Sequence, residues 1–213
     1  MTPLDSPVEI LPLFPLAVVL FPQARLPLHI FEERYKTLIN ECNTFDTPFG
    51  INLFLHQEIH PIGCSAVVNK IVQRYPDGSM DIVVEGQQRY TFHRIVDMRR
   101  PYFSGAISWY DDMEVLAAED LRERAVRLHN EFVAVVFKET VGPVLLKDIR
   151  KTRSFFLVQK SGLDVQQRQS FLTMRSENDR LTLLIRHFES MIPLLSSQRT
   201  IEELAKNDGY IQE

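Results

Sequence analysis

Residues 11–35 read LPLFPLAVVLFPQARLPLHIFEERY, and this run sets how the N-terminal part of the chain can fold. Four prolines interrupt it, and a proline has no N–H and a fixed φ, so it avoids helix interiors and central strands. The run therefore predicts three extended segments, 10–14, 17–21 and 26–30. From Phe31 onwards, apolar residues recur at helical spacing behind two glutamates in the first turn. The predicted order is strand, strand, strand, helix.

Hairpin-connected strands are predicted from this helix to residue 110. The expected strands are 49–55, 64–74, 80–84, 88–97 and 102–110. Tyr75-Pro76-Asp77-Gly78 separates two of them, because proline presets φ and glycine accepts the left-handed conformation. Strands joined by hairpins, with a single early helix, predict a small, partly closed β-barrel over residues 1–111.

The composition changes at residues 111 and 112, and helical patterns replace strand patterns. An apolar stripe between Leu121 and Val136 predicts a first helix, and a second is expected over 144–160. A capping box of Asp164 with Gln167 opens a third. A fourth begins after Ser176, and Pro193 should kink or end it. Residues 112–213 thus predict an all-α helical bundle, and the chain as a whole predicts an α+β fold.

Several motifs in the first half resemble one known family. They are Leu13-Phe14-Pro15, Val19-Leu20-Phe21-Pro22, the segment LPLHIFE at 26–32, Arg34-Tyr35, and more loosely Tyr75-Pro76-Asp77-Gly78, Val84-Glu85-Gly86, Arg89-Tyr90 and Pro101-Tyr102. Together they resemble the N-terminal, substrate-binding domain of Lon proteases. This resemblance implies a PUA-like barrel followed by a helical bundle, which agrees with the pattern of the residues.

The bulk composition narrows the function classes. A hydrophobic content of 45% and a charged content of 24% are ordinary for a soluble globular protein, and the net charge of -4 argues against nucleic acid as the default partner. Cys42 and Cys64 suit a reducing compartment. The apolar run at 10–21 is short, is broken by prolines and lacks a preceding basic residue, so it predicts neither a signal nor a membrane span. We expect a cytoplasmic protein without a membrane partner.

Catalytic and metal-binding motifs are missing from the sequence. It contains no G-x-x-x-x-G-K-[ST] phosphate loop, and Asp77-Gly78-Ser79 is better explained as a turn than as a nucleophile. In 56–60, HQEIH, the glutamate stands one place too late for a zinc-protease motif, and Pro61 follows directly. The ATPase and peptidase modules of Lon lie downstream of its N-terminal domain, so the resemblance implies a stand-alone, non-catalytic domain. We expect no enzyme activity, no cofactor and no metal.

Aromatic residues give the first candidate binding site. Tyr102, Phe103, Trp109 and Tyr110 lie near the expected junction of barrel and helices. Rigid rings offer a large contact area at low entropic cost, so a groove lined by them would suit an apolar, unfolded peptide. The alternative is that these rings belong to the core between the two parts of the chain.

Basic residues give a second candidate site. Between Lys147 and Arg186 there are nine basic residues and four acidic ones, although the chain as a whole is acidic. These residues are either the solvated faces of helices or a surface for an acidic protein partner or nucleic acid. The candidate contacts are Lys147, Arg150, Lys151 and Arg153.

Two functional hypotheses remain open. The resemblance favours a protein-binding module that recognises exposed apolar segments of proteins, or a specific protein partner, in a groove between barrel and helices. The alternative is RNA binding through the PUA-like barrel and the basic helical face, because PUA-like barrels also occur in RNA-binding proteins. The two differ in salt dependence, since phosphate contacts weaken steeply as salt rises.

Overall fold

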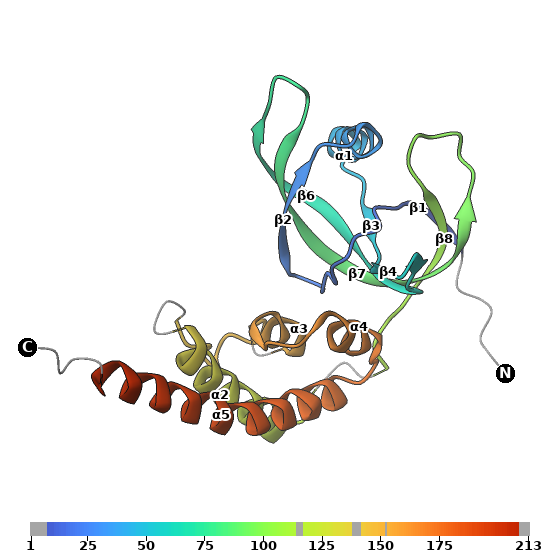
Figure 1. Ribbon diagram of the computed structural model, residues 1–213. Coiled ribbons are helices and arrows are strands. Elements are labelled where there is room, and N and C mark those ends of the chain that lie inside the picture. Colours follow the sequence, from blue (N-terminus) through green and yellow to red (C-terminus); the bar gives the residue numbers. More distant parts are fainter. Residues whose placement is uncertain (1–7, 114–116, 138–141, 152, 209–213) are drawn as a thin grey trace, which may run out of the picture. The chain divides into compact units, whose positions relative to one another are not determined.

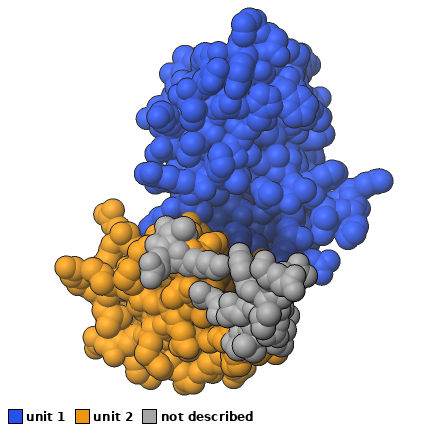
Figure 2. Space-filling model, turned by 60° about the vertical axis from the view of Figure 1, so that its left-hand side comes forward, with its two compact units in different colours: residues 1–112, 164–173 blue, residues 113–163, 174–213 orange. Residues whose placement is uncertain are grey.

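The computed structural model describes residues 8–113, 117–137, 142–151 and 153–208 (Figure 1). Its contacts divide the chain into two compact units, coloured separately in Figure 2. Unit 1 is Met1–Asp112 with Asp164–Thr173, and unit 2 is Met113–Leu163 with Met174–Glu213. The single domain boundary expected after residue 111 stays a prediction. What the contacts add is that ten residues from the C-terminal half pack with the sheet.

Unit 1 is built on one curved antiparallel sheet with the strand order β1-β8-β7-β6-β3. Its strands are β1 (Glu9–Pro12), β2 (Arg25–Ile30), β3 (Phe49–Ile51), β6 (Ile62–Arg74), β7 (Met80–Val96) and β8 (Ser104–Trp109). The short strands β4 (Phe54–Leu55) and β5 (Glu58–Ile59) form a separate hairpin. The predicted strand-rich N-terminal half is confirmed.

β7 is the longest strand, with 17 residues, and replaces the two strands predicted at 80–84 and 88–97. β6 pairs with it along its length, while β2 pairs with Met80–Glu85 and β8 with Tyr90–Val96. The neighbour changes around Gly86, where an added Cβ would lie 2.2 Å from the backbone oxygen of Phe21. The sequence predicted a break between two strands at this glycine. Gly86 instead lies within one strand, where the absence of a side chain lets the backbone of Phe21 approach closely.

The sheet curls into a partly closed barrel, as predicted (Figure 1). Isolated parallel bridges join Leu13 to Gly50 and Leu16 to Leu53, so the chain after β1 lies beside β3 without forming a continuous strand there. The barrel is therefore not closed. The strand predicted at 17–21 is wrong: this segment follows Pro15, precedes Pro22 and buries Phe21 without pairing as a strand.

Two helices pack on the sheet of unit 1. α1 (Glu33–Phe45) buries Leu38, Ile39 and Cys42, which confirms the predicted early helix. α4 (Val165–Thr173) contacts β6, and its Phe171 ring lies edge-on to Phe21 at 5.9 Å between centroids. The predicted capping box opens α4, because Asp164 accepts the Gln167 N–H at 2.8 Å and Gln167 accepts the Asp164 N–H at 3.0 Å.

Unit 2 is helical. It contains α2 (Glu119–Phe137), α3 (Ser154–Leu157) with the 3-10 turn η1 (Val158–Lys160), and α5 (Glu177–Asp208). α2 packs along α5, with the rings of Phe132 and Phe188 5.1 Å apart. The predicted stripe of α5 is buried or half-buried, and that of α2 is buried at Ala125, Leu128 and Phe132 but wrong at Val136, which is 41% exposed. α5 continues through Pro193 and does not end there.

The helix predicted over 144–160 is wrong for residues 144–151 and 153, which lie outside any helix, while residue 152 lies outside the described residues. Turns stand at 146–147 and 149–151, and helical structure begins only at Ser154. Lys147 and Lys151 would stand one turn apart on a helix, as would Arg150 and Arg153, and like charges at these spacings disfavour helix. Side-chain to backbone hydrogen bonds hold the turns instead, among them the Lys151 N–H to Asp148 Oδ1 at 3.3 Å.

Candidate functional site

The four predicted aromatic residues lie at opposite ends of β8. Tyr102 and Phe103 precede the strand, Trp109 ends it and Tyr110 follows it. A six-residue strand spans about 20 Å. The structure therefore brings these residues together as two pairs, not as one cluster.

Tyr102 is a structural anchor at the first end. It is buried, and its hydroxyl donates a hydrogen bond to Glu41 Oε2 on α1 at 2.6 Å. Arg100 also pairs with Glu41, and its guanidinium carbon lies 5.9 Å from the centre of the Tyr102 ring. Burial and the bond to Glu41 raise the pKa of Tyr102 to about 12, so the hydroxyl stays a donor at neutral pH. Together, these contacts fasten the β7–β8 connection to α1.

Exposed apolar side chains stand on both segments that this anchor joins. Phe103 and Met98 are each 46% exposed on the β7–β8 connection, and Phe45 at the end of α1 is 72% exposed. Phe45 stands four residues after Glu41, so both lie on the same helix face. Asp97 accepts the Arg99 N–H at 2.8 Å, which fixes the turn that carries Met98. We call Phe45, Met98 and Phe103 the rim cluster.

The second end of β8 is engaged in contacts within unit 1. The indole N–H of Trp109 donates to Glu9 Oε1 at 2.9 Å, and its ring packs against the core cluster that includes Tyr90. The Tyr110 hydroxyl donates to the Thr173 oxygen of α4 at 2.8 Å. These bonds hold β8 between β1 and α4.

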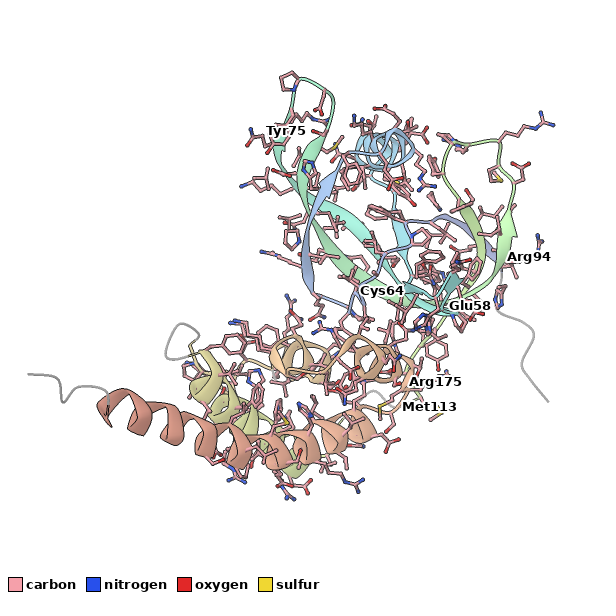
Figure 3. The ribbon with its side chains drawn as sticks, in the orientation of Figure 1. Glu58, Cys64, Tyr75, Arg94, Met113 and Arg175 are labelled. Carbon is pink, nitrogen blue, oxygen red and sulfur yellow. The ribbon has the colours of Figure 1, made fainter. Side chains whose placement is uncertain are left out.

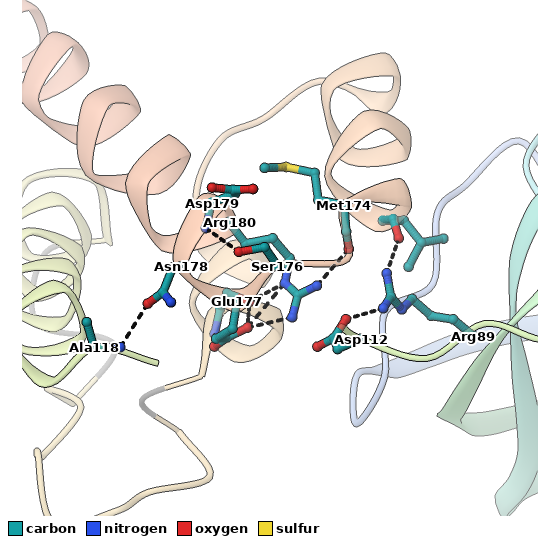
Figure 4. Close-up of polar contacts among 11 residues, drawn as sticks. Arg89, Asp112, Ala118, Met174, Ser176, Glu177, Asn178, Asp179 and Arg180 are labelled. Atoms are coloured by element: carbon teal, nitrogen blue, oxygen red, sulfur yellow. Dashed lines mark hydrogen bonds and ion pairs between the residues drawn. The ribbon is translucent and has the colours of Figure 1, made fainter. Parts of the chain in front are cut away.

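Arg89 supports the same end of the sheet, and its role was not predicted. It is 3% exposed, donates to the Leu172 oxygen at 2.7 Å and pairs with Asp112 (Figure 4). Its guanidinium carbon also lies 5.0 Å from the centre of the Tyr110 ring. A buried arginine is costly without partners, so this network explains why a charged residue stands in the middle of β7.

The four predicted basic residues lie in the chain between α2 and α3 and not on a helix. Lys147, Arg150, Lys151 and Arg153 are all exposed there. The sequence pattern missed what accompanies them: Leu145, Leu146 and Ile149 are exposed between the cations, at 51%, 45% and 63%. The surface is therefore mixed, apolar and basic.

The histidines do not form a metal site in the part of the chain that the structure describes. His56 lies at the β4–β5 turn with a φ of 51°, and no group of three or more His, Cys, Asp or Glu side chains there is placed to hold a metal ion. His29 bonds to Asp81 at 2.7 Å, and Asp81 also accepts the hydroxyl of Tyr75, labelled in Figure 3. These two hydrogen bonds lower the pKa of Asp81.

Residues 10–190 match the family described as the ATP-dependent protease La (LON) substrate-binding domain. The chain belongs to the Lon substrate-binding domain family. Two curated relatives are Lon proteases. The one from Azorhizobium caulinodans is 26% identical over 92% of this chain, and the one from Roseiflexus castenholzii is 24% identical over 96%. The match spans about a quarter of each relative, 24% and 27% of their lengths.

Solved structures of the family share the fold. The Lon N-terminal domain protein from Xanthomonas campestris superposes with a TM-score of 0.64 at 23% identity, covering 84% of this chain and 98% of that one. The N-terminal domain of the Mycobacterium avium complex Lon protease also gives 0.64, at 16% identity, covering 85% and 98%. The predicted family and fold are thereby confirmed.

For a member of the Lon substrate-binding domain family, the described side chains offer contact chemistry in two places. Unit 1 carries the rim cluster, which is apolar, and unit 2 carries the mixed segment around Lys147 and Ile149. Within the described ranges, no helix is long and apolar enough to cross a membrane.

Proposed function

We propose that this protein is a non-enzymatic recognition module that binds exposed apolar segments of other proteins through the rim cluster. Membership of a substrate-binding domain family supports protein recognition in general. The observation that carries the finer proposal is the exposure of three large apolar side chains, Phe45, Met98 and Phe103, on the two segments that the Tyr102–Glu41 bond joins. Exposed apolar groups that gather on one surface are a common mark of a protein contact site.

The anchor explains why these side chains stay available for binding. Glu41 holds both Arg100 and Tyr102, so the β7–β8 connection has little freedom to fold its apolar residues inward. A surface ordered before binding loses less entropy on contact. Methionine adds a flexible side chain that adapts to different partners, which suits recognition without strict sequence demands. Of the four predicted aromatic residues, Phe103 is the proposed contact and Tyr102 its support. Trp109 and Tyr110 remain predicted contacts.

The test is a titration with reduced, carboxymethylated lactalbumin as a permanently unfolded probe. Anisotropy of the labelled probe is followed at low and at moderate ionic strength. We expect saturable binding that survives moderate salt, because burial of apolar surface is not screened by ions.

The variant Met98→Ser/Phe103→Ser should weaken this binding about tenfold or more. A matched control is Phe31→Ser, which removes a 64% exposed phenylalanine elsewhere on unit 1 and should leave binding unchanged. Binding that collapses with salt, or that is unaffected in the double variant, would contradict the proposal.

A further inference from the structure

We propose that residues 145–151 of unit 2 form a docking surface for an acidic, apolar segment of a partner protein. This inference goes beyond the recognition of apolar segments by unit 1, because it concerns another unit and another chemistry. It rests on how the segment is held, what it exposes and what charge it carries.

The segment is fastened at its N-terminal side. Asn130 of α2 donates to the Val144 oxygen at 2.9 Å and accepts the Val144 N–H at 2.8 Å. The amide side chain thus satisfies both backbone groups of one residue, as a neighbouring strand would. Val144 itself is buried, at 7% exposure.

A buried ionic network fastens the other side. Ser154 donates its N–H to Glu177 Oε1 at 2.8 Å and its hydroxyl to Glu177 Oε2 at 2.6 Å. Arg180 pairs with Glu177 at 2.7 Å and also donates to the Ser154 hydroxyl at 2.9 Å (Figure 4). Because these groups are buried, the start of α3 is held firmly against α5.

Between the two attachments, the side chains point outward. Leu145, Leu146 and Ile149 are between 45% and 63% exposed, and Lys147, Arg150 and Lys151 are exposed as well. The Asp148 N–H donates to the Leu145 oxygen at 3.0 Å, so the turn has a defined shape. Three aliphatic side chains on a fixed backbone are a costly arrangement in water unless something covers them.

The charge of the segment identifies the occupant. It contains three cations and one carboxylate, and that carboxylate, Asp148, pairs with Lys151 at 3.1 Å. The surplus positive charge favours an acidic partner, and the aliphatic side chains favour one that also carries apolar groups. In such contacts the charges steer association and the apolar core supplies much of the affinity.

Other occupants fit less well. Single-stranded nucleic acid is bound by aromatic stacking along a basic groove, and residues 145–151 contain no aromatic side chain. Surface binding to an anionic membrane typically uses an amphipathic helix with an uninterrupted basic face, whereas this segment forms turns and contains Asp148. An acidic protein segment satisfies both the charge and the aliphatic side chains.

The experiment uses the full chain and three fluorescein-labelled peptides, with alternating leucine and glutamate, leucine and lysine, or serine and glutamate. We expect saturable binding of the leucine–glutamate peptide and at least tenfold weaker binding of the other two. The variants Lys147→Glu/Arg150→Glu and Leu145→Ser/Leu146→Ser should each weaken the first peptide about tenfold or more.

Matched controls separate this surface from other effects. Arg127→Glu/Arg186→Glu makes the same charge change at exposed positions of α2 and α5 and should leave binding unchanged. Met98→Ser/Phe103→Ser is measured with the same peptide. Binding that falls in this variant but not in the two variants of residues 145–151 would assign the peptide to the rim cluster, so failure here and failure of the rim cluster are distinguishable. Thermal unfolding confirms that each variant is folded.

Four results would overturn the proposal. The first two are no binding of the leucine–glutamate peptide and equally tight binding of the leucine–lysine peptide. The third is that only the charge variant loses peptide binding while the wild type also binds a single-stranded RNA. The fourth is that the wild type binds anionic phospholipid vesicles through residues 145–151 and does not bind the peptide.

Discussion

The ring of Tyr90 lies directly against Gly63, where an added methyl group would come within 2.7 Å of the ring. Gly50 faces the same tyrosine from β3, with an even closer approach. The Tyr90 hydroxyl donates to Asn52, which satisfies a polar group that is fully buried. Two glycines thus make room for one large side chain in the core of the barrel, and Asn52 accepts its hydroxyl hydrogen bond.

We therefore expect Gly63→Ala to destabilise unit 1 by about 1–3 kcal/mol, because an overpacked core must shift its neighbours. The measurement is urea unfolding followed by the fluorescence of Trp109, the single tryptophan, which packs on the same cluster. Gly142→Ala is the control, since no described atom beyond its chain neighbours lies within 4 Å of its added Cβ. Equal stability of both variants would contradict the expected overpacking.

Arg180 should be essential for the stability of unit 2. It is 1% exposed, and Arg180→Met would leave the Glu177 carboxylate buried without its cation. We expect a loss of about 3 kcal/mol or more in the free energy of unfolding, measured by far-ultraviolet circular dichroism in urea.

A surface ion pair supplies the comparison. Arg124→Met removes the exposed pair with Glu189 and should cost about 1 kcal/mol or less. If Arg180→Met were no more costly than Arg124→Met, the network around Ser154 would not fasten the 145–151 segment.

His129 should make unit 2 less stable in acid. It is 3% exposed in the α2–α5 core, its Nδ1 has no hydrogen-bond partner among the described residues, and burial lowers its pKa. The unfolded pKa is about 6.5. Because the pKa of His129 in the folded state lies below this value, the unfolded state binds more protons at mildly acidic pH. The stability associated with neutral His129 is therefore fully present above the unfolded pKa and is lost as the pH falls from there through the folded pKa.

Urea unfolding at neutral and at mildly acidic pH tests this expectation. The wild type should lose more stability on acidification than His129→Gln, whereas His56→Asn, a change at an exposed turn, should behave like the wild type. The same acid sensitivity in the wild type and His129→Gln would show that another group titrates.

Glu41 should affect binding although it is not apolar. Glu41→Ala removes the partner of both Tyr102 and Arg100, so we expect a loss of about 1–3 kcal/mol and weaker binding of unfolded protein. Glu33→Ala on the same helix removes a carboxylate that is 87% exposed, and its partner Lys36 keeps its hydrogen bond to the Asp77 oxygen, so neither quantity should change. Unchanged binding of unfolded protein by Glu41→Ala would show that the rim cluster does not depend on the Glu41 contacts.

Local signals in the sequence predicted much of this fold. The prolines of residues 11–35, the turn at Tyr75–Gly78 and the capping box of Asp164 with Gln167 each act within a few residues, so their effect can be recognised in the chain itself. The errors came where a distant contact overrode the local pattern. Gly86 lies inside one continuous strand, where the backbone of Phe21 approaches it, and Asn130 on α2 binds both backbone groups of Val144 at the start of the segment predicted as a helix.

The candidate sites divide in the same way. Sequence alone identified the family through its proline-rich opening, the aromatic residues near β8 and the basic residues after residue 146, because residue types and spacing are local properties. Only the tertiary structure decided that Tyr102 is buried while Phe103 is exposed, and that Leu145, Leu146 and Ile149 stand between the cations. Exposure depends on what packs against a side chain from elsewhere in the chain, and Glu41, Asn130 and Glu177 lie too far away in sequence for any local pattern to reveal it.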